Sequence, residues 1–293
     1  MADDESRLTL KAHAKINLAL EVLDKRPDGY HEVSMIMQSV SLHDTVTLSL
    51  QAANITLSCD RSELLCDNSN LAFRAADLLR REYGIARGVQ IELTKRIPLA
   101  AGLAGGSTDA AAVLKGLNRL WNMDLPAAEL ERLAARLGSD VPFCLQGGTS
   151  LATGRGEILT ALPDFSGYGV VLANPPLAVS TAWVYGNYRS AVGNRRRDVS
   201  TLRRSIEQQD FPAVAAALFN DLESVTVPAY PPITALKEQL LQAGAAGVLM
   251  SGSGPTVFAL TPDPASAGKL AGQAALGSDV AVFIAETVAR EEM

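Results

Sequence analysis

Residues 98–112 read PLAAGLAGGSTDAAA, a stretch of small residues that runs into an alanine-rich helical pattern ending near Trp121. Its three glycines let backbone N–H groups converge and let a ligand approach without a Cβ in the way. A helix that starts at Ser107 or Thr108 adds unpaired first-turn N–H groups and the positive end of its dipole. The stretch therefore predicts an anion site and favours a phosphate chain, with both hydroxyls in reach of phosphate oxygens or a magnesium ion.

The same stretch is also compatible with a plain glycine-rich turn before an N-capped helix. It is not a Walker loop, because no Gly-Lys-Ser/Thr sequence closes it. It is not a dinucleotide-binding fingerprint either, because the Gly-x-Gly pairs elsewhere in the chain lack the later glycine. Whether the stretch binds phosphate or is only a turn therefore has to be judged from motifs elsewhere in the chain.

Composition narrows the class of protein. A chain of 293 residues with 47% hydrophobic and 20% charged residues predicts a globular protein of two domains. Its net charge of −6 argues against a nucleic-acid partner, and three cysteines without C-x-x-C spacing predict free thiols and no zinc site. The acidic N-terminus has no signal-peptide pattern, and two prolines interrupt the long uncharged stretch 165–188. We therefore expect a cytoplasmic protein with no membrane segment.

Hydrophobic periodicity predicts an α+β fold. Strands are expected at 16–22, 46–50 and 89–93, and helices at 71–82, 108–121 and 126–137. A boundary between Gly154 and Gly169 divides the chain into domains of residues 1–160 and 161–293. Beyond it, helices at 212–219 and 233–243 precede a strand, a helix and a strand at 257–260, 265–276 and 280–288, which predicts a split β-α-β unit. The arginines at 195–197 are interpreted as a solvated loop.

Three separated blocks resemble, in order, the three motifs of the GHMP kinases: Lys15-Ile16-Asn17-Leu18, residues 98–112 and residues 247–256. The resemblance implies a two-lobed fold, with a ribosomal-S5-like N-terminal domain that binds ATP and a ferredoxin-like C-terminal domain. Within the family, segments 26–31 and 137–143 resemble members whose substrate carries cytidine diphosphate. That similarity implies transfer of the γ-phosphoryl group of ATP, which brings Mg²⁺, to the 2-hydroxyl of a methylerythritol moiety in non-mevalonate isoprenoid biosynthesis.

The resemblance also implies roles for individual residues. Asp140 would take the proton of the acceptor hydroxyl, and Lys15 would hold that carboxylate ionised and offset charge on the γ-phosphate. Without the other motifs, Lys15 would read as a solvated strand lysine and Asp140 as a turn cap. Asp109 is the rival base, but we assign it a structural role, because an acid in the first turn is favoured by the helix dipole.

The binding residues implied by the resemblance fall into two sets, and no residue is expected to hold a metal by itself. The substrate set uses an imidazole for the polar edge of cytosine and aromatic rings for its faces. It consists of Asn17, Tyr30, His31 and Tyr185. The ATP set consists of Pro98, Leu99, Ala100, Ala101, Gly102, Leu103, Ala104, Gly105, Gly106, Ser107 and Thr108, with Asn70 at the adenine.

Three departures from the family pattern accompany these assignments. Thr108 stands where a second serine is common and Ala101 where a glycine is common, while Met37 replaces an aromatic residue near the cytosine. Other readings stay open: another GHMP small-molecule kinase, a diphosphomevalonate-type decarboxylase, or a nucleotide-sensing relative without catalysis. Segment 26–31 speaks against the decarboxylase. The joint presence of Lys15, the loop and Asp140 speaks against the sensor.

Overall fold

The computed structural model describes residues 6–189 and 198–290, so the arginines at 195–197 lie outside the described residues. The chain forms two compact units whose segments interleave along the sequence. The first unit contains Met1–Ala14, His43–Ile97 and Ala104–Gln146, and the second contains Lys15–Leu42, Pro98–Leu103 and Gly147–Met293. The strands β1 (Arg7–Lys25) and β2 (His31–Gln51) each contribute to both units. A domain boundary at residue 160 stays a prediction.

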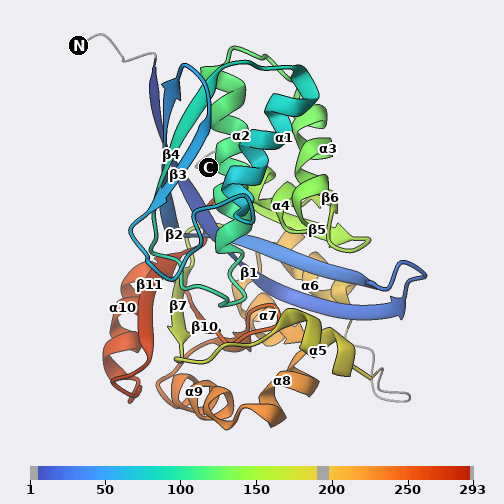
Figure 1. Ribbon diagram of the computed structural model, residues 1–293. Coiled ribbons are helices and arrows are strands. Elements are labelled where there is room, and N and C mark those ends of the chain that lie inside the picture. The colour runs from blue at the N-terminus through green and yellow to red at the C-terminus, as the bar shows by residue number, and fades with distance from the viewer. Residues whose placement is uncertain (1–5, 190–197, 291–293) are drawn as a thin grey trace. The chain divides into compact units, whose positions relative to one another are not determined.

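The first unit is a sheet covered by helices. Its strands follow the order β3-β4-β2-β1, and β2 pairs antiparallel with β4, with Leu48 opposite Ile91. The helices α1 and α2 cover one face of this sheet (Figure 1). The approach is close, because a Cβ on Gly116 of α2 would lie 2.4 Å from a methyl group of Leu48. Besides β1 and β2, the elements of this unit are β3 (Ile55–Cys59), β4 (Gly88–Thr94), α1 (Leu71–Tyr83), α2 (Gly105–Leu120), α3 (Ala127–Leu137) and α4 (Val141–Gln146).

The second unit contains a separate four-stranded antiparallel sheet with the order β11-β7-β10-β9. The helices α9 and α10 pack against it (Figure 1). With α10 connecting β10 to β11 beyond β7, this order confirms the predicted split β-α-β unit. The elements are β7 (Gly169–Asn174), α9 (Pro231–Gln242), β9 (Gly247–Met250), β10 (Val257–Thr261), α10 (Pro264–Gln273) and β11 (Ala281–Glu286).

The rest of the second unit is built around parts of β1 and β2. A two-residue strand, β8 (Phe219–Asn220), pairs parallel with β1 at Ala19 and Leu20. On the other side, β5 (Thr149–Thr153) pairs with β2 and with β6 (Ile158–Ala161). The helices of this part are α5 (Thr181–Asn187), α6 (Val199–Glu207), α7 (Phe211–Ala216) and α8 (Glu223–Ala229).

The α+β class is confirmed, but several element bounds were wrong. The strands expected at 16–22 and 46–50 belong to β1 and β2, which are 19 and 21 residues long. Residues 12–20 are buried on both faces of β1. A strand buried in this way lacks the alternation of apolar and polar residues from which a sequence predicts where a strand ends. The six-residue α4 was missed, since so short a helix has no measurable periodicity.

Two further expectations concern membranes and thiols. Within residues 6–189 and 198–290, no helix combines the length and apolar character needed to cross a membrane. Cys59, Cys66 and Cys144 are free thiols, as the spacing predicted.

Candidate active site

Lys15 lies in the buried middle of β1 and not on a solvated face. It is 4% exposed, and its ammonium donates to Oδ1 of Asn17 at 2.7 Å and to the carbonyl of Gly102 at 3.1 Å. Asn17, two residues along the same strand, is 1% exposed and donates to the sulfur of Met35. A solvated strand lysine is therefore the wrong reading of Lys15. Burying a lysine is costly unless hydrogen bonds hold it, so Lys15 is a candidate functional residue.

The carbonyl of Gly102 joins all three motifs within the second unit. Besides the Lys15 ammonium, it accepts the hydroxyl of Ser251 at 3.0 Å. Gly102 has φ +75°, and a Cβ there would lie 2.3 Å from the carbonyl oxygen of Ser251. Only glycine fits this position, because backbone from the third motif fills the space that a side chain would need. Sequence analysis missed Ser251, whose only signal was its place in the third motif.

The third motif brings backbone against Lys15. After β9 the chain turns through residues 251–254, where Gly252 has φ +55°. A Cβ on Gly252 would lie 3.4 Å from the Lys15 ammonium and 3.5 Å from Oδ1 of Asn17. The structure shows a close approach to the first motif.

The helix that follows the glycine loop begins earlier than predicted, at Gly105. Ala104 precedes it in the left-handed region with φ +59°, and no side chain caps the helix. Gly106 is exposed and Ser107 is half-buried, so solvent reaches the first turn of the helix at these residues. This arrangement is compatible with anion binding, since first-turn N–H groups have no partner inside the helix.

Two members of the predicted ATP set have local roles. Thr108 is 1% exposed, and its hydroxyl donates to the carbonyl of His13 at 2.7 Å, so it points into the first unit. The expectation that this hydroxyl reaches phosphate or magnesium is therefore wrong. Asn70 caps α1 by accepting the amide of Ala72 at 2.9 Å and donates to the carbonyl of Leu65. Its amide group is thus used locally, and an adenine contact stays a prediction.

Asp109 is buried in an ionic cluster beneath the start of α2. Its Oδ2 lies 2.5 Å from the ammonium of Lys95, which also contacts Asp44. Asp44 in turn accepts the amides of Arg96 and Ile97. The structural role assigned to Asp109 agrees with this geometry, but the reason was wrong. Asp109 lies beyond the first helical turn, so the ammonium of buried Lys95, and not the helix dipole, stabilises it.

Asp140 lies in the first unit, directly before α4. It is half-buried, and its carbonyl accepts the amide of Cys144 at 3.0 Å. Val141 and Phe143 after it are at most 1% exposed, so Asp140 borders a buried apolar segment. Lys15 belongs to the second unit.

The predicted substrate residues lie in three places in the second unit: Asn17 beside Lys15, His31 with Tyr185, and Tyr30 beside Arg155. The ring of His31 stacks on Tyr185 at 5.4 Å between centroids, and it forms a T-shaped pair with Tyr188 at 6.3 Å. Burial, together with nearby Lys25, lowers the pKa of His31, which favours the neutral imidazole. Tyr30 does not join this cluster: it is 55% exposed and lies under the guanidinium of Arg155 at 5.0 Å.

Tyr188 was missed, because nothing in its local sequence distinguishes it from a packing residue. Its hydroxyl lies 3.4 Å from Oδ2 of Asp221. Burial, with Asp221 nearby, raises the pKa of Tyr188 to about 12. The hydroxyl is therefore protonated at neutral pH.

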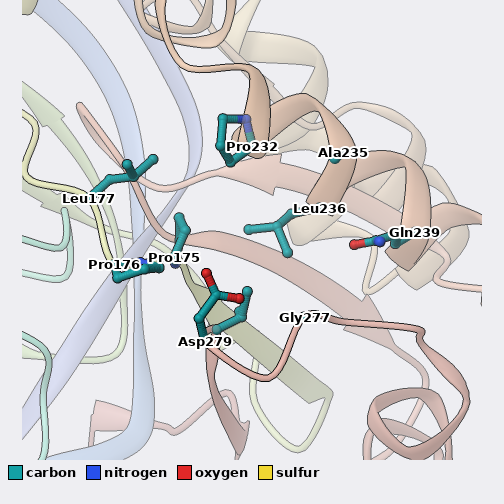
Figure 2. A pocket seen from close by; sticks show the side chains of 10 residues that line it. Pro175, Pro176, Leu177, Pro232, Ala235, Leu236, Gln239, Gly277 and Asp279 are labelled. Carbon is teal, nitrogen blue, oxygen red and sulfur yellow. The ribbon is translucent and has the colours of Figure 1, made fainter.

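A hollow of about 200 Å³ lies elsewhere in the second unit (Figure 2). It is formed between the segment after β7, the helix α9 and the chain before β11, and none of the predicted site residues faces it. Its lining consists of Pro175, Pro176, Leu177, Pro232, Ala235, Leu236, Gln239, Gly277, Asp279 and Val280.

Family models and known proteins agree on the family. The model for the GHMP kinases N terminal domain matches residues 70–148, and that for the GHMP kinases C terminal matches residues 202–275. The chain is 53% identical to a 4-diphosphocytidyl-2-C-methyl-D-erythritol kinase of a Synechococcus species over 87% of its length and 85% of the relative's. It is 46% identical to the protein of that name from Acetivibrio thermocellus, over 96% of this chain and 99% of the other.

Solved structures show the same relationship. A crystal structure of 4-(cytidine 5'-diphospho)-2C-methyl-D-erythritol kinase is similar with a TM-score of 0.79 and 32% identity, covering 96% of this chain and 99% of the other. A homoserine kinase from Cytophaga hutchinsonii, 20% identical, shares the fold with a TM-score of 0.80 over 99% of this chain and 96% of its own. With three motifs converging on one carbonyl and two family models matched, the chain belongs to the GHMP kinase family.

Proposed function

We propose that this protein transfers the γ-phosphoryl group of ATP to the 2-hydroxyl of 4-diphosphocytidyl-2-C-methyl-D-erythritol, a step of non-mevalonate isoprenoid biosynthesis. The observation that carries the proposal is the convergence of Lys15, Gly102 and Ser251 in a chain about half identical to kinases of that name. The mevalonate diphosphate decarboxylase structures are only 16–17% identical, so they support the shared fold and not a shared reaction.

In the proposed reaction a new bond forms between the 2-hydroxyl oxygen and the γ-phosphorus, and the bond from that phosphorus to the leaving oxygen of ADP breaks. Phosphoryl transfer of this kind needs mainly positioning and charge neutralisation. Asp140 accepts the proton of the hydroxyl, as a carboxylate general base can. Lys15, held by Asn17 and Gly102, offsets the charge that develops on the γ-phosphate.

ATP is assigned to the loop 98–107 and the first turn of α2. The exposed backbone at Gly106 and the half-buried hydroxyl of Ser107 support this assignment, because they leave donors available for phosphate oxygens. Within residues 6–189 and 198–290, no three His, Cys, Asp or Glu side chains gather as a metal site. Magnesium commonly binds substrate phosphates with few protein ligands, so it enters here with ATP.

Cytosine recognition is assigned to the cluster of His31, Tyr185 and Tyr188. A neutral imidazole can donate to or accept from the polar edge of the base, while tyrosine rings offer stacking faces. The stacked pair of His31 and Tyr185 supports this assignment for both residues. Tyr30, which is exposed beside Arg155, is also kept as a proposed stacking residue, because its ring is accessible to a base.

A substrate panel tests the proposal. The protein is incubated with MgATP and, separately, with 4-diphosphocytidyl-2-C-methyl-D-erythritol, methylerythritol phosphate, homoserine, mevalonate and mevalonate diphosphate. ADP release and the ³¹P spectrum of the product are followed, with Asp140→Asn as the inactive control. We expect a new phosphate monoester on the cytidine-bearing substrate. Turnover of another alcohol, carbon dioxide from mevalonate diphosphate, or no ADP from any substrate would each contradict the proposal.

A further inference from the structure

A buried asparagine connects the strand that carries Lys15 with the turn of the third motif. Asn220, which is 4% exposed, forms the second residue of β8 and pairs with Leu20 of β1. The amide of the next residue, Asp221, donates to the carbonyl of Leu20 at 2.9 Å and fixes this pairing. Asn220 therefore has a defined position relative to β1.

From this position the side chain of Asn220 reaches the turn 251–254. Its Nδ2 donates to two carbonyls, of Met250 at 2.8 Å and of Gly252 at 2.7 Å. Its Oδ1 accepts the amide of Leu222 at 3.0 Å. All the hydrogen-bonding groups of the amide are thus satisfied by backbone, and the two donor bonds hold the last residue of β9 and the turn that follows it.

The turn held in this way forms one wall of the Lys15 site. Gly252 approaches so closely that a Cβ there would lie 3.4 Å from the Lys15 ammonium, and the neighbouring Ser251 hydroxyl shares the Gly102 carbonyl with that ammonium. A shift of the turn would therefore open space beside the ammonium and change its hydrogen bonding.

We propose that Asn220 is a positioning residue for Lys15, acting through the turn 251–254. The inference rests on the proposed function, in which Lys15 offsets charge on the γ-phosphate. Asn220 itself touches neither substrate nor the reacting atoms in this scheme. It keeps the wall of the site in place, so its loss changes where the Lys15 ammonium sits.

Chemical labelling tests the positioning without any catalysis. Asn220→Asp keeps the size and the acceptor of the side chain but removes the donors to Met250 and Gly252. Asn118→Asp is the matched control, because Asn118 also donates to and accepts from backbone, at Leu125, and lies in the first unit. Each protein is acetylated with limiting acetic anhydride, and mass spectrometry measures Lys15 relative to exposed Lys269. We expect labelling of Lys15 to rise several-fold in Asn220→Asp and not in the control.

Kinetics test whether the positioning serves the reaction. Misplacing a reacting group by about 1 Å can cost about 10²-fold, so kcat of Asn220→Asp should fall by up to that factor with little change in KM for ATP. In a Lys15→Met background, adding Asn220→Asp should cost nothing more, because the group that it positions is absent. If Asn220→Asp does not fold, Asn220→Ser, which keeps one donor, replaces it.

Several outcomes would overturn the inference. Unchanged labelling of Lys15 would show that the turn does not position the ammonium, whether or not the protein is a kinase. Labelling of Lys15 could rise while the kcat of the double variant falls by the product of the two single losses. That result would show that Asn220 affects the reaction through a group other than Lys15. Failure of the proposed function looks different, since the wild type would then not phosphorylate the cytidine-bearing substrate, while the labelling result still decides the role of Asn220.

Discussion

Replacing Asp109 by asparagine changes the charge of a buried cluster. Lys95 faces both Asp44 and Asp109, and none of the three side chains is more than 3% exposed. One ammonium with two carboxylates leaves the fully ionised cluster with a net negative charge, which burial disfavours. Burial therefore raises the pKa of Asp109, to about 7, although Lys95 opposes the rise. Asparagine removes this titration and keeps the shape of the side chain.

The direction of the pH effect follows from linkage. Because the pKa of Asp109 is higher in the folded protein than its ordinary 3.8, the folded state binds the proton more tightly. Its contribution to stability is complete below about pH 4 and is lost as the pH rises through about 7. At about 1.36 kcal/mol per pKa unit, the whole contribution is about 4 kcal/mol, of which about 3 kcal/mol is lost between about pH 5 and 8.5.

Asparagine also adds a cost that does not depend on pH. Oδ1 of Asp109 is buried and has no hydrogen-bond partner among the described residues. An amide nitrogen in that place would be an unpaired donor, at about 1–3 kcal/mol. The slope with pH, and not the difference at a single pH, is therefore the informative quantity.

Thermal unfolding of both proteins from about pH 5 to about pH 8.5 measures this slope. At about 2–4 °C per kcal/mol, the Tm of Asp109→Asn relative to the wild type should rise by about 6 °C or more. Asp263→Asn is the control, since hydrogen bonds from Ser266 lower the pKa of Asp263 and keep it ionised throughout the range. A Tm difference for Asp109→Asn that is flat or falls with pH would refute the reasoning.

Three further predictions concern the proposed reaction. Asp140→Asn should lower kcat by about 10²–10⁴-fold at unchanged Tm and ATP affinity, and near-normal turnover would remove Asp140 as the base. Gly106→Val should fold normally, because a Cβ there meets only Leu71 at 3.7 Å, yet weaken binding of a non-hydrolysable ATP analogue in titration calorimetry; unchanged affinity would reduce the loop to a turn. His31→Ala should lower kcat/KM for the cytidine-bearing substrate by a factor equivalent to about 1–3 kcal/mol, and should change kcat/KM for methylerythritol phosphate little. Equal losses on both substrates would contradict cytosine recognition.

Much of the fold could be read from local patterns. The helix pattern from Leu71 predicted α1 to within a residue, and Gly138 marked the end of α3. These signals depend only on neighbours along the chain. The extent of β1 and β2 could not be read in the same way, because both strands are buried on two faces for part of their length and so show no alternation there.

The candidate site, like the fold, could be predicted from the sequence only in part. The order of the three motifs was visible in the sequence, and it indicated that Lys15, the glycine loop and the turn near Gly252 belong together. The family resemblance placed His31, in segment 26–31, among the substrate residues. The resemblance also grouped Tyr185 with it at the cytosine, whereas the stacking of the two rings, more than a hundred positions apart, is shown only by the tertiary structure.

The sequence by itself determined which segments carry chemistry, because glycine content, helix signals and motif order are properties of short stretches. Only the tertiary structure decided which polar groups are buried and which partners satisfy them. It placed the Thr108 hydroxyl on the carbonyl of His13, set Tyr30 under the guanidinium of Arg155, and paired Asp109 with Lys95. The physical reason is that a buried polar group is stabilised by whichever distant segment folds against it. Periodicity records only that a face is apolar or polar, and not what covers it.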